Sequence, residues 1–423
     1  MALQTDRDIR RITIVGGGTS GYLAAFYLSK NYPDKTITWI FPSENDPIGV
    51  GEALVPKSSN FLQSIGISHL DILKFCNGTL KLGIVFDGFD IPGVRFSFPF
   101  GIGVGETHNT ASVNRIIDTE RIPDNILDYP DIATHFRTTE LAEYLDTRVS
   151  EFPNLTVIRD TASLDSLVGT YDLLIDSTGF GRHVSKLPDN FEDFSHIIPN
   201  NRALTTRVKY TNRPKQCKPY SLFKAMDYGW CWHIPLGDRL AFGYVHNNKF
   251  DVRNEFINHV ADYMEINPAD VEVNTVDFLT GRNKIHLKDN VVSIGLASTF
   301  IEPLESTGIY LIVSSIERIA QYINGTITED EYNQQTNTGF DAIVNFIAAH
   351  YKYSARSNDY WDKFKNLTIE KYKETDIFPQ EAWQYILSGF GLSPRPYEPI
   401  DPKDLISIHR GTPYSEWIEN VRY

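Results

Sequence analysis

Three glycines near the N-terminus have the spacing of a dinucleotide-binding loop. A short apolar, β-forming segment, RITIV, leads into Gly16, Gly18 and Gly21, and an alanine-rich helical pattern follows. In this context the first glycine permits a tight turn, the second lets the backbone approach a pyrophosphate, and the third lets the helix pack on the strand. Because unpaired N–H groups at a helix N-terminus bind phosphate, the loop predicts a cofactor site that includes Thr19 and Ser20.

This loop binds FAD in some proteins and NAD in others, and the rest of the sequence favours FAD. Two further apolar segments that end in glycine turns, at 171–182 and 290–296, lie far from the first in the chain. That separation is expected when a substrate domain is inserted between the strands of a flavoprotein. The acid expected about 20 positions after the loop, which would hold the adenosine ribose, is missing. Phe41 stands there, and Glu44 is the nearest carboxylate.

Other residues with chemical potential have ordinary alternatives when each is taken alone. Trp230 and Trp232 would pack on one face of a strand, because side chains at i and i+2 share a face. Lys81 would be solvated, as most lysines are. Glu305 would be a carboxylate at a helix start, where the helix dipole favours it.

Five segments, in the same order along the chain, resemble the flavin-dependent halogenases. WCWHIP at 230–235 matches the family motif W-x-W-x-I-P. The other matching segments are GGGTSG at 16–21, IGVGEA at 48–53, CNGTLK at 76–81 and FIEPLESTGI at 300–309. The resemblance extends over about residues 11–390, and the chain is similar to a compact, tryptophan-halogenase-like member.

The resemblance implies a reaction and a role for each residue. In the family, reduced FAD and O₂ oxidise a halide to hypohalous acid, which moves through the interior to a lysine, here Lys81. Glu305 would accept the ring proton of the substrate or orient the halogen donor on the lysine, and Ser306 would adjust that carboxylate. Thr307 and Gly308 would hold the halide with backbone N–H groups at a helix N-terminus. The flavin contacts implied are Val50, Gly51, Ala53, Gly295, Leu296 and Ile309. The two tryptophans would keep the substrate away from the flavin.

The segments that would contact the substrate depart from the family members that act on tryptophan. Those members carry a histidine in F-x-H-P-F, whereas this chain has Phe98 in FSFPF. Phe98 and Phe100 are predicted to sandwich a flat ring, with Tyr360 and Trp361 in the same pocket. EAWQYILSGFGL at 381–392 resembles members that do not use free tryptophan. The expected substrate is therefore an indole or phenol, with bromide or iodide preferred over chloride.

The elements that must position these residues predict an α/β fold. We expect a Rossmann-like FAD-binding fold of the two-domain flavin monooxygenase type, with an inserted β-rich substrate layer and a helical C-terminal region. Isoleucines at 309, 312, 316, 319 and 323 have the spacing of one helix face. The predicted FAD domain comprises 8–85, 130–184 and 281–335; the substrate region comprises 86–129 and 185–280; the helical region is 336–423.

Composition excludes several classes of protein. The 423 residues carry 40 Lys and Arg against 54 Asp and Glu, and a net charge of -14 disfavours nucleic-acid binding. Three cysteines cannot form a disulfide framework or a cysteine zinc site, and no paired metal-ligand spacing predicts a metal. No run of 18 apolar residues occurs, so we expect no membrane span and a cytoplasmic location. The sequence leaves the oligomeric state open, a homo-oligomer included.

Two other functions share the FAD fold. A second glycine fingerprint for NAD(P)H is absent, so reduced flavin is expected to come from a separate reductase. A single-component FAD aromatic hydroxylase would instead use NAD(P)H directly and would not need Lys81. A non-catalytic flavin-binding protein would use LESTG at 304–308 only as a helix cap.

Overall fold

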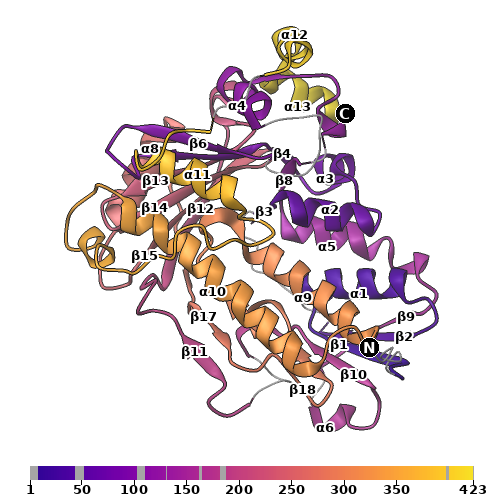
Figure 1. Cartoon of the computed structure of the whole chain (residues 1–423). Helices are drawn as coiled ribbons and strands as arrows, with labels where there is room; N and C mark the ends of the chain where they lie inside the picture. The colour runs from indigo at the N-terminus through magenta and orange to yellow at the C-terminus, as the bar shows by residue number, and fades with distance from the viewer. Residues whose placement is uncertain are drawn as a thin grey trace.

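The structure is a computed structural model that describes residues 8–42, 52–101, 110–129, 131–161, 164–181, 187–396 and 400–422. Two large sheets form its framework, and the helices α9 (Gly308–Ile323) and α10 (Glu329–Tyr353) run between them (Figure 1). This arrangement confirms the predicted α/β class with an inserted β-rich layer.

The first sheet is the nucleotide-binding sheet, with the strand order β18-β19-β10-β1-β2-β9. Its strands are β1 (Arg11–Val15), β2 (Thr36–Phe41), β9 (Leu155–Arg159), β10 (Leu173–Asp176), β18 (Leu287–Lys288) and β19 (Val291–Ser293). All neighbours pair in parallel except β18 and β19. The three apolar segments that predicted one nucleotide fold are therefore adjacent strands. Val15 pairs with Asp176 and Asp176 with Ser293, so the loops after these strands leave the sheet at one edge.

The second sheet is the substrate-side sheet, with the order β16-β12-β15-β14-β13-β5-β6. Its strands are β5 (Gly83–Asp87), β6 (Arg95–Pro99), β12 (Arg202–Lys209), β13 (Ser221–Met226), β14 (Gly229–Pro235), β15 (Arg239–His246) and β16 (Asn274–Asp277). One face packs on α8 (Arg253–Met264), and an aromatic core on the other face contacts α10 and α11 (Gln380–Gly389). Two sequence segments far apart, 83–99 and 202–277, thus form one layer.

A small three-stranded sheet links the two large ones. It has the order β3-β8-β4, and its strands are β3 (Glu52–Ala53), β4 (Thr79–Lys81) and β8 (Ala133–Phe136). Lys81 pairs with Ala133, and Ala53 pairs with His135 on the opposite side of β8. The segment at 52–54 and the lysine strand therefore lie on either side of the same central strand.

The helices include the predicted isoleucine stripe. In α9 four of the five isoleucines are buried and Ile312 is partly buried, which confirms the helix that begins beside Thr307. α10 starts at Glu329 with a capping box from Thr328 and Glu331, so the predicted boundary at 336 falls inside a helix. The other α-helices in the described residues are α1 (Thr19–Asn31), α2 (Pro56–Ser64), α3 (His69–Phe75), α4 (Thr110–Thr119), α5 (Thr138–Asp146), α6 (Leu164–Leu167), α7 (Arg213–Gln216), α12 (Pro402–Arg410) and α13 (Tyr414–Arg422).

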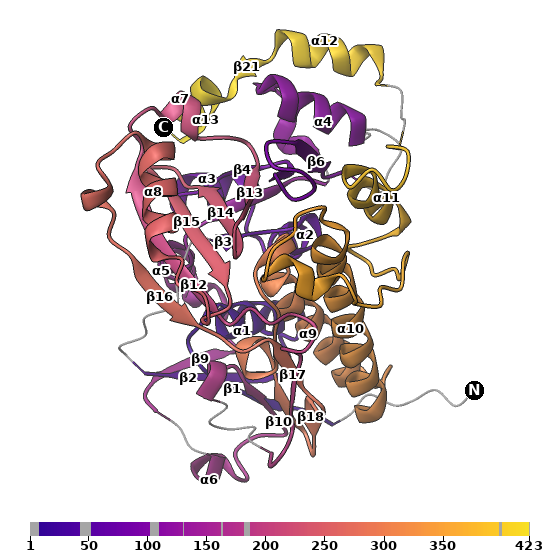
Figure 2. The ribbon, with the colours of Figure 1, turned by 90° about the vertical axis from the view of Figure 1, so that its left-hand side faces the viewer.

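The C-terminal residues return to the substrate side. α12 lies beside α4, and α13 lies beside α3 and α7, at the end of the molecule away from the nucleotide-binding sheet (Figure 2). β21 (Thr412–Pro413) pairs with β7 (Arg121–Ile122), which fastens this segment to the substrate region.

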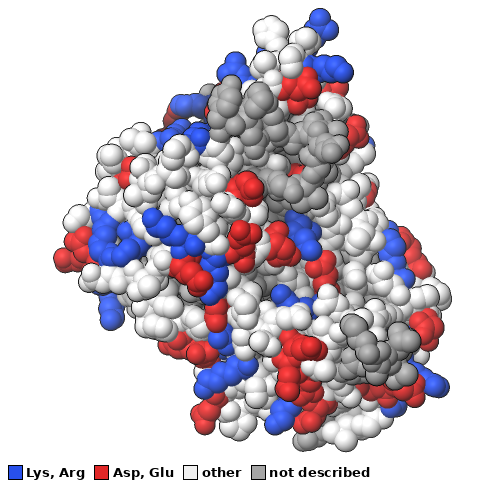
Figure 3. All heavy atoms as spheres, viewed as in Figure 1, with Lys and Arg blue, Asp and Glu red and all other residues white. Residues whose placement is uncertain are grey.

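Charge is mixed on the surface. On the face shown in Figure 3, acidic and basic side chains are interspersed with uncharged ones. Among the described helices, none combines the length and the apolar character needed to cross a membrane.

Candidate functional site

A cavity of about 800 Å³ extends from the glycine loop to the substrate-side sheet. Its walls come from parts of the chain that are distant in sequence, among them the loop after β1, the β3 segment, the start of α9 and the strands β13 and β14. The predicted flavin contacts that line it are Gly16, Gly18, Thr19, Ser20, Ala53, Gly295, Leu296 and Ile309. Gly21 lies just behind the loop, and Val50 and Gly51 lie outside the described residues.

The three positions of the loop require glycine for different physical reasons. Gly16 has φ +120°, and a Cβ there would lie 2.4 Å from the Ser177 carbonyl oxygen. A Cβ on Gly21 would lie 2.0 Å from the Gly16 carbonyl oxygen, so this glycine permits the close packing of α1. A Cβ on Gly18 would meet nothing within 4 Å. Gly18 therefore keeps open the space in front of the helix.

The N-terminus of α1 fits a pyrophosphate. Gly18 is its N-cap residue, no side chain caps the helix, and the first turn has no acidic residue. The backbone N–H groups and the positive end of the helix dipole thus face a cavity that nothing else of the described chain fills. An FAD pyrophosphate would supply the missing acceptors.

The adenosine end of the cavity differs from the usual pattern. Phe41 is buried, and the Arg159 guanidinium lies 4.3 Å from its ring centroid. Phe41 pairs with Arg159 in the sheet, so the residue after the neighbouring strand, Asp160, reaches the same edge and lines the cavity. The fingerprint spacing could not find this carboxylate, because only the pairing of β2 with β9 brings it there.

Lys81 is fully buried, and the alternative of a solvated lysine is wrong. Its Nζ donates to the Leu54 carbonyl oxygen and to Ser306 Oγ, each at 2.9 Å, and lies 5.2 Å from the centre of the Phe100 ring. Burial lowers the pKa of Lys81 to about 7, although the negative charge of Glu305 acts in the opposite direction. Phe100 thus packs under the lysine.

Glu305 and Ser306 direct their side chains to different partners. Both residues have left-handed backbone conformations, with φ 68° and 59°. Ser306 Oγ accepts from Lys81, whereas Glu305 Oε1 lies 2.8 Å from His350 Nε2. Ser306 also lines the cavity, so this residue contacts both the cavity and the buried ammonium group. The prediction that Ser306 acts on the carboxylate is not reflected in these contacts.

The start of α9 has the same open character as the start of α1. Thr307 is the N-cap residue, no side-chain hydrogen bond caps the helix, and the first turn carries no acid. A Cβ on Gly308 would meet nothing within 4 Å, and Gly308 lines the cavity. The geometry fits a small anion beside Gly308.

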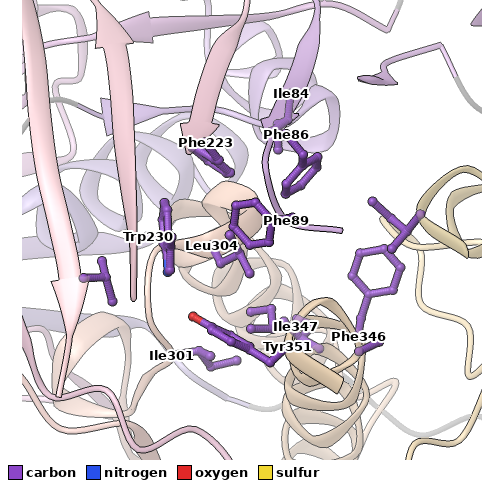
Figure 4. Close-up of a cluster of buried hydrophobic side chains, with 14 of the residues drawn as sticks. Ile84, Phe86, Phe89, Phe223, Trp230, Ile301, Leu304, Phe346, Ile347 and Tyr351 are labelled. Carbon is purple, nitrogen blue, oxygen red and sulfur yellow. The ribbon is translucent and has the colours of Figure 1, made fainter. Parts of the chain in front are cut away.

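Trp230 and Trp232 lie in β14 and line the substrate-side end of the cavity. Trp230 Nε1 donates to Glu302 Oε1 at 3.2 Å, and the Tyr351 hydroxyl donates to the same oxygen. Figure 4 shows Tyr351 directed toward Trp230 within the aromatic cluster. Asn200 Nδ2 donates to Glu302 Oε2 at 2.7 Å. Glu302 is fully buried, and burial raises its pKa to about 7.

The other predicted substrate contacts do not line this cavity. Phe98 packs against Phe346 in the aromatic core. The Tyr360 hydroxyl donates to Asn200 Oδ1 at 3.0 Å, and Trp361 Nε1 donates to the Met226 carbonyl oxygen at 3.1 Å. Both aromatic residues are fully buried. Their contact with a substrate stays a prediction.

Sequence reasoning did not assign a role to Glu302 or His350, although Glu302 lies in the segment 300–309 that carried the resemblance. Glu302 is three residues before Glu305, and His350 begins the segment HYKY. Nothing in one sequence distinguishes a buried carboxylate that binds an indole N–H from an exposed one. Their burial and partners come only from packing.

A separate group of possible metal ligands lies away from the cavity. Cys231 and His233 of β14 face His259 of α8, and their ligand atoms lie within 4.8 Å of one another. The two histidine Nε2 atoms are 2.8 Å apart, which fits a hydrogen bond between the rings. Burial, His259 and the charges of Lys224 and Arg95 lower the pKa of His233, so the surroundings disfavour added positive charge.

Comparisons with known proteins place the chain in a family. The tryptophan halogenase family model matches residues 11–138 and 157–403. Tryptophan 6-halogenase ThaL of Streptomyces albogriseolus is 29% identical, over 86% of this chain and 80% of that protein. Tryptophan 6-halogenase SttH of Streptomyces toxytricini is 27% identical, over 96% and 90%.

Solved structures share the fold. The flavin-dependent halogenase BrvH from Brevundimonas sp. BAL3 superposes with a TM-score of 0.79, at 24% identity, over 98% of this chain and 99% of that one. The family match covers the glycine loop, Lys81, the tryptophan pair and the segment around Glu305. The chain therefore belongs to the tryptophan halogenase family of flavin-dependent enzymes.

Proposed function

We propose that this enzyme uses reduced FAD, O₂ and a halide to halogenate an electron-rich arene, an indole or a phenol, rather than free tryptophan. The observation that carries the proposal is the hydrogen bond from the buried Lys81 ammonium group to Ser306, a residue that lines the cavity. A fully buried lysine without a carboxylate bonded to it costs stability, so its retention there supports a chemical role.

The halide would bind at the start of α9. The N–H groups of Thr307 and Gly308 supply positive charge without a side chain, and the open space beside Gly308 admits anions of different size. When bound in the cavity, reduced FAD supplies with O₂ the two-electron oxidation that turns the halide into hypohalous acid. Gly308 and Ile309 both line the cavity, so the halide would lie beside the cofactor.

Lys81 would receive the hypohalous acid. With a pKa of about 7, the lysine populates both the ammonium and the amine form at neutral pH. The ammonium donates a hydrogen bond to the oxygen of hypohalous acid, and the amine can carry the halogen. Ser306, which contacts both the lysine and the cavity, lies on the path between them. Glu305 would take the proton that the arene loses.

The two tryptophans would keep the arene away from the flavin end. Their indoles line the cavity, and Glu302 fixes the Trp230 ring through its N–H. A carboxylate held by Trp230, Tyr351 and Asn200 makes this wall stiff. Hypohalous acid would leave past Ser306, the lining residue that contacts Lys81.

The substrate proposal rests on Phe98. The tryptophan-specific family members have a histidine at this position, and an apolar ring here gives no hydrogen bond to an amino acid. Apolar pockets discriminate weakly between ligands of similar size, so we propose a broad substrate range. Bromide and iodide are easier to oxidise than chloride, and the open α9 site does not exclude them. We therefore propose that bromide or iodide is preferred.

A substrate panel tests the proposal. The purified protein is incubated with FAD, NADH, a separate flavin reductase, one arene and equimolar chloride, bromide and iodide, and products are identified by mass spectrometry. The expected result is monohalogenated indoles and phenols, mainly brominated or iodinated. Strict chlorination of tryptophan would contradict the substrate and halide proposals. NAD(P)H oxidation and hydroxylated product without the reductase would instead identify a single-component hydroxylase.

A further inference from the structure

His350 is a buried histidine in contact with the proposed base. Its ring and the Glu305 carboxylate are 0% and 1% exposed, and Nε2 lies 2.8 Å from Oε1. The other ring nitrogen, Nδ1, lies 3.0 Å from the Phe346 carbonyl oxygen one turn earlier in α10. The Nε2–Oε1 contact lacks ideal hydrogen-bond geometry, and among the described residues neither atom has another partner.

These two contacts fix the number of protons. A carbonyl oxygen only accepts, so the contact at Nδ1 requires hydrogen on that nitrogen. A neutral ring of this tautomer has a lone pair on Nε2, which would face a carboxylate lone pair at 2.8 Å. The opposite tautomer would place the Nδ1 lone pair against the carbonyl oxygen. Both contacts are attractive only when the His350–Glu305 pair holds one proton in addition to that of the neutral ring.

The surroundings help to keep that proton in the pair. The ring centres of Phe86, Phe346 and Phe390 lie 5.2, 5.3 and 6.3 Å from the centre of the imidazole. These rings come from β5, from α10 and from the residue that follows α11, so the imidazole is surrounded by apolar rings of three elements. The titratable groups whose charge reaches the pair are Lys81 from β4 and Glu302. Glu302 is already bonded to Trp230, Tyr351 and Asn200.

We propose that His350 is a positioning residue that stores, together with Glu305, the proton consumed when the halogen–oxygen bond breaks. This inference rests on the proposed halogenation. The arene carbon forms a bond to the halogen, the halogen–oxygen bond breaks, and its electron pair stays on oxygen. That oxygen takes the stored proton from Glu305 and leaves as water. The arene carbon then loses its own proton to Glu305, which restores the pair.

Two substitutions separate a stored proton from simple packing. His350→Phe keeps a ring in the aromatic cage but removes both nitrogens. His350→Gln keeps an amide that can donate to Glu305 but cannot carry an extra proton. His69 of α3, a buried histidine bonded to Gln63, provides matched controls in His69→Phe and His69→Gln. Halogenation kcat is measured against pH with a saturating arene, alongside hypohalous acid released to a dye trap.

We expect His350→Phe to lower halogenation kcat by about 10²-fold, the lower range for loss of acid–base catalysis. His350→Gln should recover part of the rate, but the alkaline limb of its pH profile should move to lower pH. The reason is that the glutamine amide can donate to Glu305 but cannot carry the extra proton. Release of hypohalous acid should stay at the wild-type rate in every variant, because His350 does not line the cavity.

The outcomes are distinguishable. If wild-type enzyme gives no halogenated product, the proposed function fails. If wild-type enzyme is active and both His350 variants keep its rate and pH profile, the present inference is overturned. Full recovery by His350→Gln with an unshifted pH limb also overturns it, since a fixed donor would then suffice.

A measurement without catalysis covers the case of unstable variants. Nitrogen-15 NMR of histidine-labelled protein reports the hydrogen on each ring nitrogen, and Glu305→Gln identifies the His350 signals. We expect Nδ1 of His350 to carry hydrogen in wild type and Nε2 to share a proton that is lost in Glu305→Gln. A wild-type ring with bare Nδ1 would overturn the proton count.

Discussion

At the scale of single residues, the site is built from titratable groups that burial has moved from their ordinary behaviour. Lys81 is fully buried with its pKa lowered to about 7, and Glu302 is fully buried with its pKa raised to about 7. Among the residues that the structure describes, neither has an oppositely charged partner bonded to it; each is satisfied by neutral donors or acceptors. Such groups reduce stability and are typical of functional sites.

The Lys81→Met variant should lose halogenated product while still binding FAD. The methionine fills a similar volume and removes only the amine, which does not line the cofactor cavity. We expect product formation to fall by at least about 10³-fold, whereas the Kd for FAD stays within about twofold. Product is measured by mass spectrometry and FAD binding by flavin fluorescence.

Lys57→Met is the matched control for Lys81→Met. Lys57 is partly exposed and forms ion pairs with Glu317 and Asp376. It should keep wild-type activity. Wild-type regiochemistry and rate in Lys81→Met would show that this lysine has no role in halogen transfer.

Glu302 makes stability depend on pH in a defined direction. Its pKa rises from 4.5 in the unfolded chain to about 7 in the folded protein, so the folded state binds more protons between these values. Its contribution is therefore present below pH 4.5 and lost as the pH rises to 7. The size is about 3 kcal/mol, at 1.36 kcal/mol per pH unit. Between pH 4.5 and pH 7, the unfolding free energy of Glu302→Gln should therefore fall by about 3 kcal/mol less than that of the wild type, as measured by urea unfolding. If the unfolding free energy of Glu302→Gln depended on pH as that of the wild type does, the raised pKa of Glu302 would be contradicted.

At the scale of elements, the functional groups lie at strand ends and helix starts. Parallel strands β10, β1 and β2 end at one edge, where α1 begins, and α9 begins at the other end of the same cavity. Neither helix is capped by a side chain. Two helix N-termini therefore face one cavity, one suited to a pyrophosphate and the other to a halide.

Gly18→Val tests the α1 site. A Cβ at this position would meet no atom of the described residues within 4 Å, so valine should leave the fold intact but occupy the pyrophosphate position and weaken FAD binding by at least about 100-fold. Gly21→Ala is the contrasting variant, because its Cβ would lie 2.0 Å from the Gly16 carbonyl oxygen and should destabilise folding. Calorimetry of both proteins with and without FAD separates the two effects. Full FAD affinity in a folded Gly18→Val protein would disprove the placement.

The end of β9 supplies the second element-scale prediction. Asp160 lines the cavity beside Phe41, and we expect its carboxylate to accept a hydrogen bond from the adenosine ribose, which Phe41 cannot do. Asp160→Asn should weaken FAD binding by about tenfold or more, the value for a hydrogen bond to a charged group. The effect is measured as the Kd for FAD, and the exposed Asp34→Asn variant is the control. An unchanged Kd would exclude Asp160 as the ribose contact.

At the scale of the whole molecule, the cofactor cavity lies between the two large sheets. Its walls combine β1, β3, β13, β14 and α9, so a bound FAD would contact both layers. FAD should therefore stabilise the protein as one unit: at a free concentration 100 times its Kd, we expect about 2.7 kcal/mol. A single thermal transition that moves upward with FAD is expected by calorimetry. A separate unfolding transition of the substrate-side layer, at a temperature that FAD does not change, would contradict this coupling.

The sequence alone determined the parts that depend on local order. The glycine loop, its flanking strand and helix, and the isoleucine stripe of α9 each follow from spacing within about one element. The segments that resemble the halogenases also identified Lys81 and Glu305. These features could be read because each one is contiguous in the chain.

The tertiary structure decided every contact between distant segments. Asp160 lines the cavity beside Phe41 only because β9 pairs with β2, and His350 reaches Glu305 only because α10 packs beside the start of α9. Burial likewise separated Lys81 from an ordinary surface lysine. The physical reason is that a pKa, a hydrogen-bond partner or a cavity wall depends on neighbours in space, and sequence spacing specifies those neighbours only within one helix, strand or turn.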